Sequence, residues 1–150
     1  MSSLFANTPL WAALIATVAA QILKVALVAL TERRWAFERL LDTGGMPSSH
    51  SATVTALVTY LGITYGWNSP YFAVAAVFGS IVIYDATGIR RAAGLHAEMI
   101  NDLVKELAHL LDAGFQPQAL KTLLGHTYPQ VLVGMLIGAT SGILISLRGG

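Results

Sequence analysis

The stretch from Ser51 to Tyr84, SATVTALVTYLGITYGWNSPYFAVAAVFGSIVIY, decides the fold of this chain, because it contains no Asp, Glu, Lys, Arg or His. An uncharged apolar run of this length is typical of membrane-spanning helices. A turn signal, Gly66-Trp67-Asn68-Ser69-Pro70, interrupts the run, so we predict two helices over 48–66 and 70–88. At about 1.5 Å per residue, each helix is about 28 Å long, close to the hydrocarbon thickness of a bilayer.

Two further stretches lack charged residues and histidine, Met1 to Leu23 and Thr127 to Leu147, and they predict spans over 8–30 and 129–147. The 150-residue chain is 55% hydrophobic and 11% charged, with a mean hydropathy of +0.62. A soluble domain rarely has this composition. We therefore predict an all-α, polytopic membrane helix bundle of about four transmembrane helices, which forms a single integral-membrane domain over 1–150. The first stretch has no basic start and no cleavage site, so we interpret it as a retained helix rather than a signal peptide.

The charges are confined to two polar regions. All eight acidic residues lie within 32–42 and 85–112, and eight of the nine basic residues lie between Lys24 and Lys121. Four spans put both regions on one side of the membrane, which the positive-inside tendency identifies as the cytoplasmic side. The predicted location is the plasma membrane of a prokaryote, with the polar site facing the cytoplasm.

The polar regions also predict one or two interfacial amphipathic helices. Apolar residues recur at helical spacing in 98–112, and this helix either lies on the membrane surface or roofs the polar site. A second, shorter helix is expected over 33–41, with Trp35 and Phe37 at headgroup depth.

Glycines in the last span predict close helix contact. Gly134, Gly138 and Gly142 stand four residues apart, which suits packing within the bundle or, as an alternative, a homodimer. The chain has no cysteine, which excludes disulfides and thiolate metal sites. The net charge is +1 and no basic stripe with interleaved aromatic residues occurs, so no nucleic-acid partner is expected.

Residues 44–51, Gly-Gly-Met-Pro-Ser-Ser-His-Ser, have the composition of a phosphate-binding turn. The glycines allow close backbone approach, and the amides at a helix start face an anion. Ser48 and Ser49 would add amide and hydroxyl donors, while His50 could protonate a leaving oxygen near neutral pH. An ordinary capped helix start is the alternative.

Other polar residues converge on the same membrane face. Lys24 lies inside the first span, where a charge needs a partner, so it is expected to contact an anion or a carboxylate. One interpretation of Asp85 is a salt-bridge partner of Lys24 or Arg91. The alternatives are a general base, a residue that orients a histidine, or a Mg²⁺ ligand. No other metal or cofactor is expected. Arg90 and Arg91 are either a topogenic anchor or a phosphate-binding pair. His126 stands where the last span begins.

Several motifs resemble a known group of membrane phosphatases. Pro47-Ser48-Ser49-His50 at a helix start, followed by the run from His126 to Gly134, is similar to the type 2 phosphatidic acid phosphatase and vanadium haloperoxidase superfamily. The whole 44–51 motif, together with Tyr-Asp-Ala-Thr-Gly-Ile-Arg-Arg-Ala-Ala-Gly at 84–94, resembles its small divergent branch. The resemblance covers nearly the whole chain, from residue 21 to residue 138.

The resemblance implies a catalytic role for each of two histidines. His50 matches the residue that protonates the leaving alcohol, and His126 matches the one that attacks phosphorus. The chain departs from the superfamily pattern at Thr31, Leu120 and Gln130, which stand where the pattern has arginine, the arginine of a Ser-Arg pair, and aspartate.

A second alignment of the third motif starts from Arg90. It makes His96 the nucleophile and leaves Ile100 at the carboxylate position. Either the site is rewired, with Arg90 or Arg91 reaching from the other loop and Asp85 replacing the missing acid, or hydrolysis has been lost.

These observations favour a membrane phosphatase that hydrolyses a phosphomonoester or pyrophosphate of a lipid, with polyprenyl or isoprenoid phosphates and phosphatidic acid as candidate substrates. The first alternative is a protein that binds or translocates a lipid phosphate without hydrolysing it. The second is a structural membrane subunit that docks a partner through its glycine-lined helix.

Overall fold

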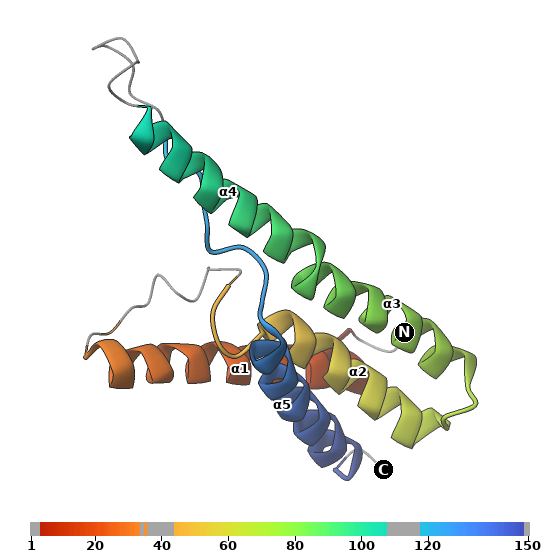
Figure 1. The fold of residues 1–150 in the computed structure, drawn as a ribbon. Helices are drawn as coiled ribbons and strands as arrows, with labels where there is room; N and C mark the ends of the chain where they lie inside the picture. The colour runs from red at the N-terminus through yellow and green to blue at the C-terminus, as the bar shows by residue number, and fades with distance from the viewer. Residues whose placement is uncertain (1–3, 34, 36–43, 108–117, 149–150) are drawn as a thin grey trace.

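The structure is a computed structural model that describes residues 4–33, 35, 44–107 and 118–148. Within these ranges every regular element is a helix, and no strand occurs. The elements are η1 (Leu4–Ala6), α1 (Thr8–Glu32), α2 (Ser49–Tyr65), α3 (Pro70–Thr87), α4 (Ile89–Glu106) and α5 (Tyr128–Ser146) (Figure 1). The all-α prediction is confirmed for this part of the chain.

The helices α1, α2, α3 and α5 correspond to the four predicted spans, and their ends agree to within two residues. Short polar side chains cap the helix starts. Asn7 accepts a hydrogen bond from the Leu10 amide at the start of α1, and Ser69 accepts one from the Phe72 amide at the start of α3. These caps satisfy amides that have no partner within the helix.

Three helices of the described chain are long and apolar enough to cross a membrane. They are Thr8–Glu32, a 37-residue helix from Pro70 to Glu106 that comprises α3 and α4, and Tyr128–Ser146. The remaining helix, α2, has 17 residues and lies at the centre of the bundle, where it contacts α1, α3 and α5. A bilayer crossing by α2, and thus the count of four spans, stays a prediction.

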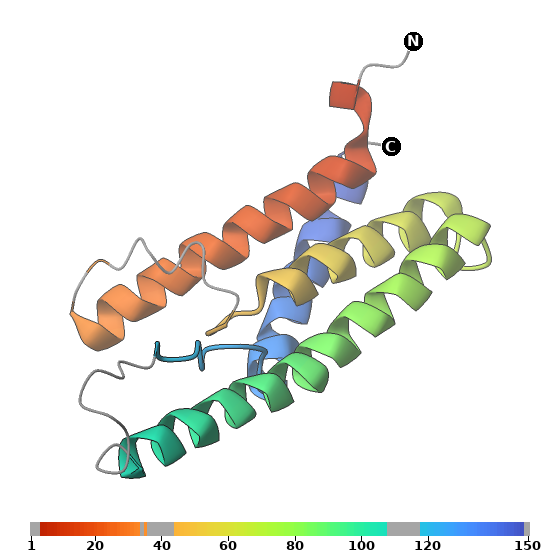
Figure 2. The same ribbon diagram turned by 90° about the horizontal axis from the view of Figure 1, so that it is seen from above.

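Small residues allow the central helices to approach closely. Ala16 and Ala20 of α1 and Ala52 and Ala56 of α2 are completely buried and form the core. Figure 2 shows α5 passing behind α1 and α2. Because side chains at these contacts are small, the backbones of the helices lie near one another.

The glycines of α5 are used within the chain. Gly134, Gly138 and Gly142 are buried, and each would bring an added Cβ against the backbone of α2 or of its N-cap, Ser48. At Gly142 that atom would stand 2.7 Å from the carbonyl oxygen of Ala56. The three glycines thus pack within the chain, which is one of the two uses expected above, and a homodimer stays a prediction.

The predicted surface helix over 98–112 begins earlier than expected. It is part of α4, which starts at Ile89 and follows the direction of α3 (Figure 1). The Gly88 amide donates to Tyr84 and the Gly88 carbonyl accepts from Ala92, so the hydrogen bonding of one helix passes into the next. Residues 108–112 lie outside the described residues. The same is true of the expected helix over 33–41, except for Arg33, which ends α1 with a φ of 53°, and Trp35.

Candidate functional site

The turn that carries His50 is built as a buried helix start. Ser48 is the N-cap of α2, and its hydroxyl accepts hydrogen bonds from the amide and the hydroxyl of Ser51. Pro47 therefore precedes the cap and does not occupy the first helical turn. Both serine side chains are fully buried, and the turn leads directly to His50, which is exposed.

The segment that carries His126 has no regular structure but is fixed at both ends. Asn101 of α4 makes two hydrogen bonds of 2.9 Å with the backbone of Leu120. Gly125 has a φ of 70°, and a side chain there would collide with the backbone of Arg91. The His126 amide then donates to the carbonyl of Ala86 at 2.9 Å. These contacts hold His126 beside the end of α3.

The two histidines face one cavity. Their ring centroids are 6.4 Å apart, although the two residues are 76 positions apart in the sequence. Both imidazoles line a cavity of about 240 Å³. The other residues of its wall come from α3 and from the first turn of α4: Ile81, Val82, Asp85, Ala86 and Arg90.

His126 is buried in this wall, with only 3% of the residue exposed. Neither of its ring nitrogens makes a hydrogen bond within the described residues. Burial lowers the pKa of His126 below its ordinary value of 6.5; the Gln130 side chain and the Gly45 backbone oppose this effect, while Lys24 and His50 lower the pKa further. The neutral imidazole is therefore the favoured form at neutral pH, and this form can attack an electrophile.

Asp85 and Arg90 form an ion pair at the rim of the cavity, through Arg90 Nε and Asp85 Oδ2. The expected partners of Asp85 were Lys24 or Arg91, so the salt-bridge interpretation holds with a different arginine. Arg91 is not part of the cavity wall, and its backbone packs against Gly125 instead. Of the two adjacent arginines, Arg90 alone thus lies where it could contact a ligand bound between His50 and His126.

Three further predicted residues are buried outside the cavity wall: Lys24, Ser48 and Ser49. Lys24 is buried, with 2% exposed, and its charge acts on both His50 and His126. It does not line the cavity, and neither do Ser48 and Ser49. Ser49 is also buried, with 7% exposed. A direct contact of these three residues with a phosphate stays a prediction.

The other predicted residues lie elsewhere. His96 is exposed on α4 and is not part of the cavity wall. Among the described side chains, no group of three or more His, Asp or Glu residues gathers where it could hold a metal ion. Asp85 alone would offer Mg²⁺ one protein carboxylate that is already paired with Arg90, so the described residues fit a metal poorly.

Two features of the site were not predicted. One is the apolar part of the cavity wall, which Ile81, Val82 and Ala86 form. Ile81 and Val82 lie one turn before Asp85 on α3, and this helical spacing could have indicated them. The other is a backbone contact of Gln130, whose carbonyl accepts a hydrogen bond from the Ser48 amide at 3.1 Å. No local pattern indicates this contact, because it joins two distant segments.

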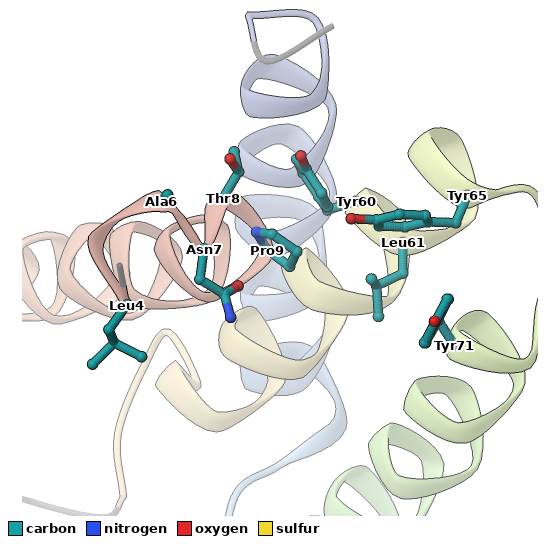
Figure 3. A pocket seen from close by; sticks show the side chains of 9 residues that line it. All are labelled: Leu4, Ala6, Asn7, Thr8, Pro9, Tyr60, Leu61, Tyr65 and Tyr71. Atoms are coloured by element: carbon teal, nitrogen blue, oxygen red, sulfur yellow. The ribbon is translucent and has the colours of Figure 1, made fainter. Parts of the chain in front are cut away.

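A second, larger cavity of about 640 Å³ lies at the opposite end of α2 (Figure 3). Tyr60, Tyr65 and Tyr71 contribute to its wall, together with the residues around the start of α1. The wall contains no Asp, Glu, Lys, Arg or His. It therefore lacks the groups that phosphate chemistry needs, and the cavity between the histidines is the better candidate.

Comparisons with known proteins identify the family of the chain. The chain is 41% identical to an uncharacterized membrane protein of Bacillus subtilis (strain 168), YuiD, over 96% of this chain and 94% of that protein. No solved structure matches the chain. A profile described as "Divergent PAP2 family" matches residues 5–141, which include every residue of the cavity wall. The chain therefore belongs to the Divergent PAP2 family.

Proposed function

We propose that this protein is a membrane phosphatase that removes a phosphate or pyrophosphate group from a lipid, such as a polyprenyl phosphate or phosphatidic acid. One observation carries the proposal: His50, His126 and the Asp85–Arg90 pair line a single cavity. Two imidazoles and a guanidinium are the groups that a phosphohistidine mechanism requires. Family membership makes the protein phosphatase-related, and the reaction is our inference.

The proposed reaction has two steps. A neutral nitrogen of His126 attacks phosphorus, and the bond between phosphorus and the leaving oxygen breaks while His50 protonates that oxygen. Water then attacks the phosphohistidine, gives a proton to His50, and releases inorganic phosphate and free His126.

Positive groups would stabilise the charge that develops on the phosphoryl oxygens. Arg90 lies in the cavity wall, and Asp85 holds its guanidinium at the rim. Lys24 contributes a buried positive charge. Asp85 is thus assigned to orient Arg90, and its negative charge also acts on His50.

The cavity wall favours an amphiphilic substrate. Ile81 and Val82 belong to its apolar part, and Ile81 is 57% exposed on the outer face of α3. A lipid tail could lie along this face while its headgroup reaches the histidines. In the proposed orientation the site faces the cytoplasm and the protein lies in a prokaryotic plasma membrane.

Phosphate release from short-chain lipid phosphates by the purified protein in detergent tests the proposal. We expect turnover that vanadate inhibits, and a loss of about 10²- to 10⁴-fold in kcat for His50→Ala and for His126→Ala. His96→Ala is the matched control, since His96 is exposed on α4 outside the cavity, and it should retain wild-type turnover. Full turnover by His50→Ala, or loss of turnover in His96→Ala alone, would refute the assignment of the two histidines.

A second candidate function is binding or translocation of a lipid phosphate without hydrolysis. Gln130 favours it, because an amide cannot stabilise an imidazolium as a carboxylate does. In that case the protein would bind the lipid phosphate saturably, with Arg90 required, and would release no phosphate with or without Mg²⁺.

A further inference from the structure

Gln130 lies where the two histidine-bearing turns meet. Its backbone carbonyl accepts a hydrogen bond from the Ser48 amide at 3.1 Å, two residues before His50. Its side-chain Oε1 accepts one from the Thr127 amide at 3.0 Å, one residue after His126. One residue of α5 is thus bonded to both turns.

The surrounding packing makes this connection rigid. Gln130 occupies the third position of α5 and forms a capping box with Thr127, in which each side chain is bonded to the other's backbone. One helical turn further on, Gly134 packs directly against the backbone and side chain of Ser48. The first turn of α5 is therefore closely packed against the first turn of α2.

We propose that Gln130 is a positioning residue that couples the two turns, so that the imidazoles of His50 and His126 face the same cavity. It is not a catalytic residue, because it does not line the cavity. The value of this positioning for catalysis rests on the proposed function. The position of His126 itself can be measured without catalysis.

The amide has a second consequence for His126. The charged or titratable groups around the imidazole are Lys24 from α1, His50 from α2, Asp85 from α3 and Arg90 from α4. Gln130 contributes no charge from α5. A carboxylate at position 130 would retain the cap, since Glu suits the third position of a capping box, but it would favour the imidazolium.

Three variants separate positioning from simple helix capping. Gln130→Ala removes the side-chain cap and leaves the backbone bond to Ser48. Gln130→Glu retains an acceptor for the Thr127 amide and adds a negative charge. Ser69→Ala is the matched control, because it removes an equivalent cap from α3. The Ser69 hydroxyl accepts a hydrogen bond from the Phe72 amide at 3.2 Å. This cap lies at the start of α3, far from Asp85 near its end.

The first measurement is the rate at which diethyl pyrocarbonate modifies His126, followed by peptide mass spectrometry. Because His126 is buried, modification should be slow in the wild type. We expect His126 to be modified about fivefold faster in Gln130→Ala, because the loss of a cap loosens its turn by about that factor. In Ser69→Ala the modification rate of His126 should equal that of the wild type. Equal rates in Gln130→Ala and Ser69→Ala would overturn the proposal and leave Gln130 as a helix cap only.

The second measurement is the NMR titration of ¹³C-labelled histidine. Gln130→Glu should raise the pKa of His126 by about one unit or more, since an opposite charge stabilises the imidazolium, while Ser69→Ala should leave it unchanged. An unshifted titration in Gln130→Glu would show that residue 130 does not face His126. If the wild type hydrolyses no lipid phosphate, the proposed function fails, but both measurements still decide the position of His126.

Discussion

At the scale of single residues, Arg90 and Arg91 show how neighbours in the sequence acquire different surroundings. Both begin α4, and a helix rotates successive side chains by about 100°. Arg90 consequently points to Asp85 and the cavity. Arg91 is half-buried on another side, where its backbone packs against Gly125.

This difference predicts unequal effects of two equivalent substitutions. Arg90→Gln should weaken vanadate inhibition about 10- to 100-fold, because it removes a charge-assisted hydrogen-bond donor from the cavity. Arg91→Gln, the matched control, should change it by less than about threefold, as expected for a residue outside the cavity. Titration of vanadate against phosphate release measures both. Equal losses in the two variants would contradict the placement of Arg90.

At the scale of elements, the site depends on how closely α5 packs against α2. The three buried glycines of α5 leave no space between the helices, and α5 follows the segment that holds His126. The distance between the two histidines therefore depends on glycine residues that have no reactive side chain.

Gly138→Val should consequently destabilise the bundle. Its side chain would overlap the Ala52 carbonyl and the Thr55 side chain, and overpacking of this kind costs about 1–3 kcal/mol. Thermal unfolding in detergent, followed by circular dichroism, should show a lower Tm. Leu136→Phe also adds volume to α5 but on a face that is 67% exposed, and it should leave the Tm unchanged. A Tm equal to that of the wild type in Gly138→Val would mean that α2 and α5 do not pack as described.

At the scale of the whole molecule, the described residues separate into a polar end and an end with few charges, where Arg148 follows α5. The candidate site lies where α2 begins and α3 ends, and the tyrosine-lined cavity lies where α2 ends and α3 begins. If α2 crosses the bilayer, as we predict for it and for the three longer apolar helices, these two ends lie on opposite membrane faces.

Single cysteines test this arrangement, because the chain contains none of its own. In intact bacterial cells, a membrane-impermeant maleimide should label Asn68→Cys and Arg148→Cys at once, and Lys105→Cys only after permeabilisation. All three positions are exposed, and the positive-inside tendency places Lys105 in the cytoplasm. Labelling of Asn68→Cys and Lys105→Cys from the same side would show that α2 does not span the membrane.

Much of the fold could be predicted because apolar stretches and turn signals act locally. The helices at 8–30, 48–66, 70–88 and 129–147 follow from the absence of charge and from the turn at residues 66–70. The early start of α4 was missed, because the stretch after Gly88 contains both arginines and looks like a loop. Its helical hydrogen bonds nevertheless continue those of α3.

The sequence by itself determined the helical class, the positions of the long helices and the candidate residues His50, Asp85, Arg90 and His126, because hydropathy and short motifs are properties of neighbouring residues. The tertiary structure alone decided which of these residues share a cavity, that Arg90 and not Arg91 faces it, and that Gln130 joins the two turns. Such contacts depend on how the backbone of α5 fits against α2. That fit is a property of pairs of helices, which no single stretch of sequence contains.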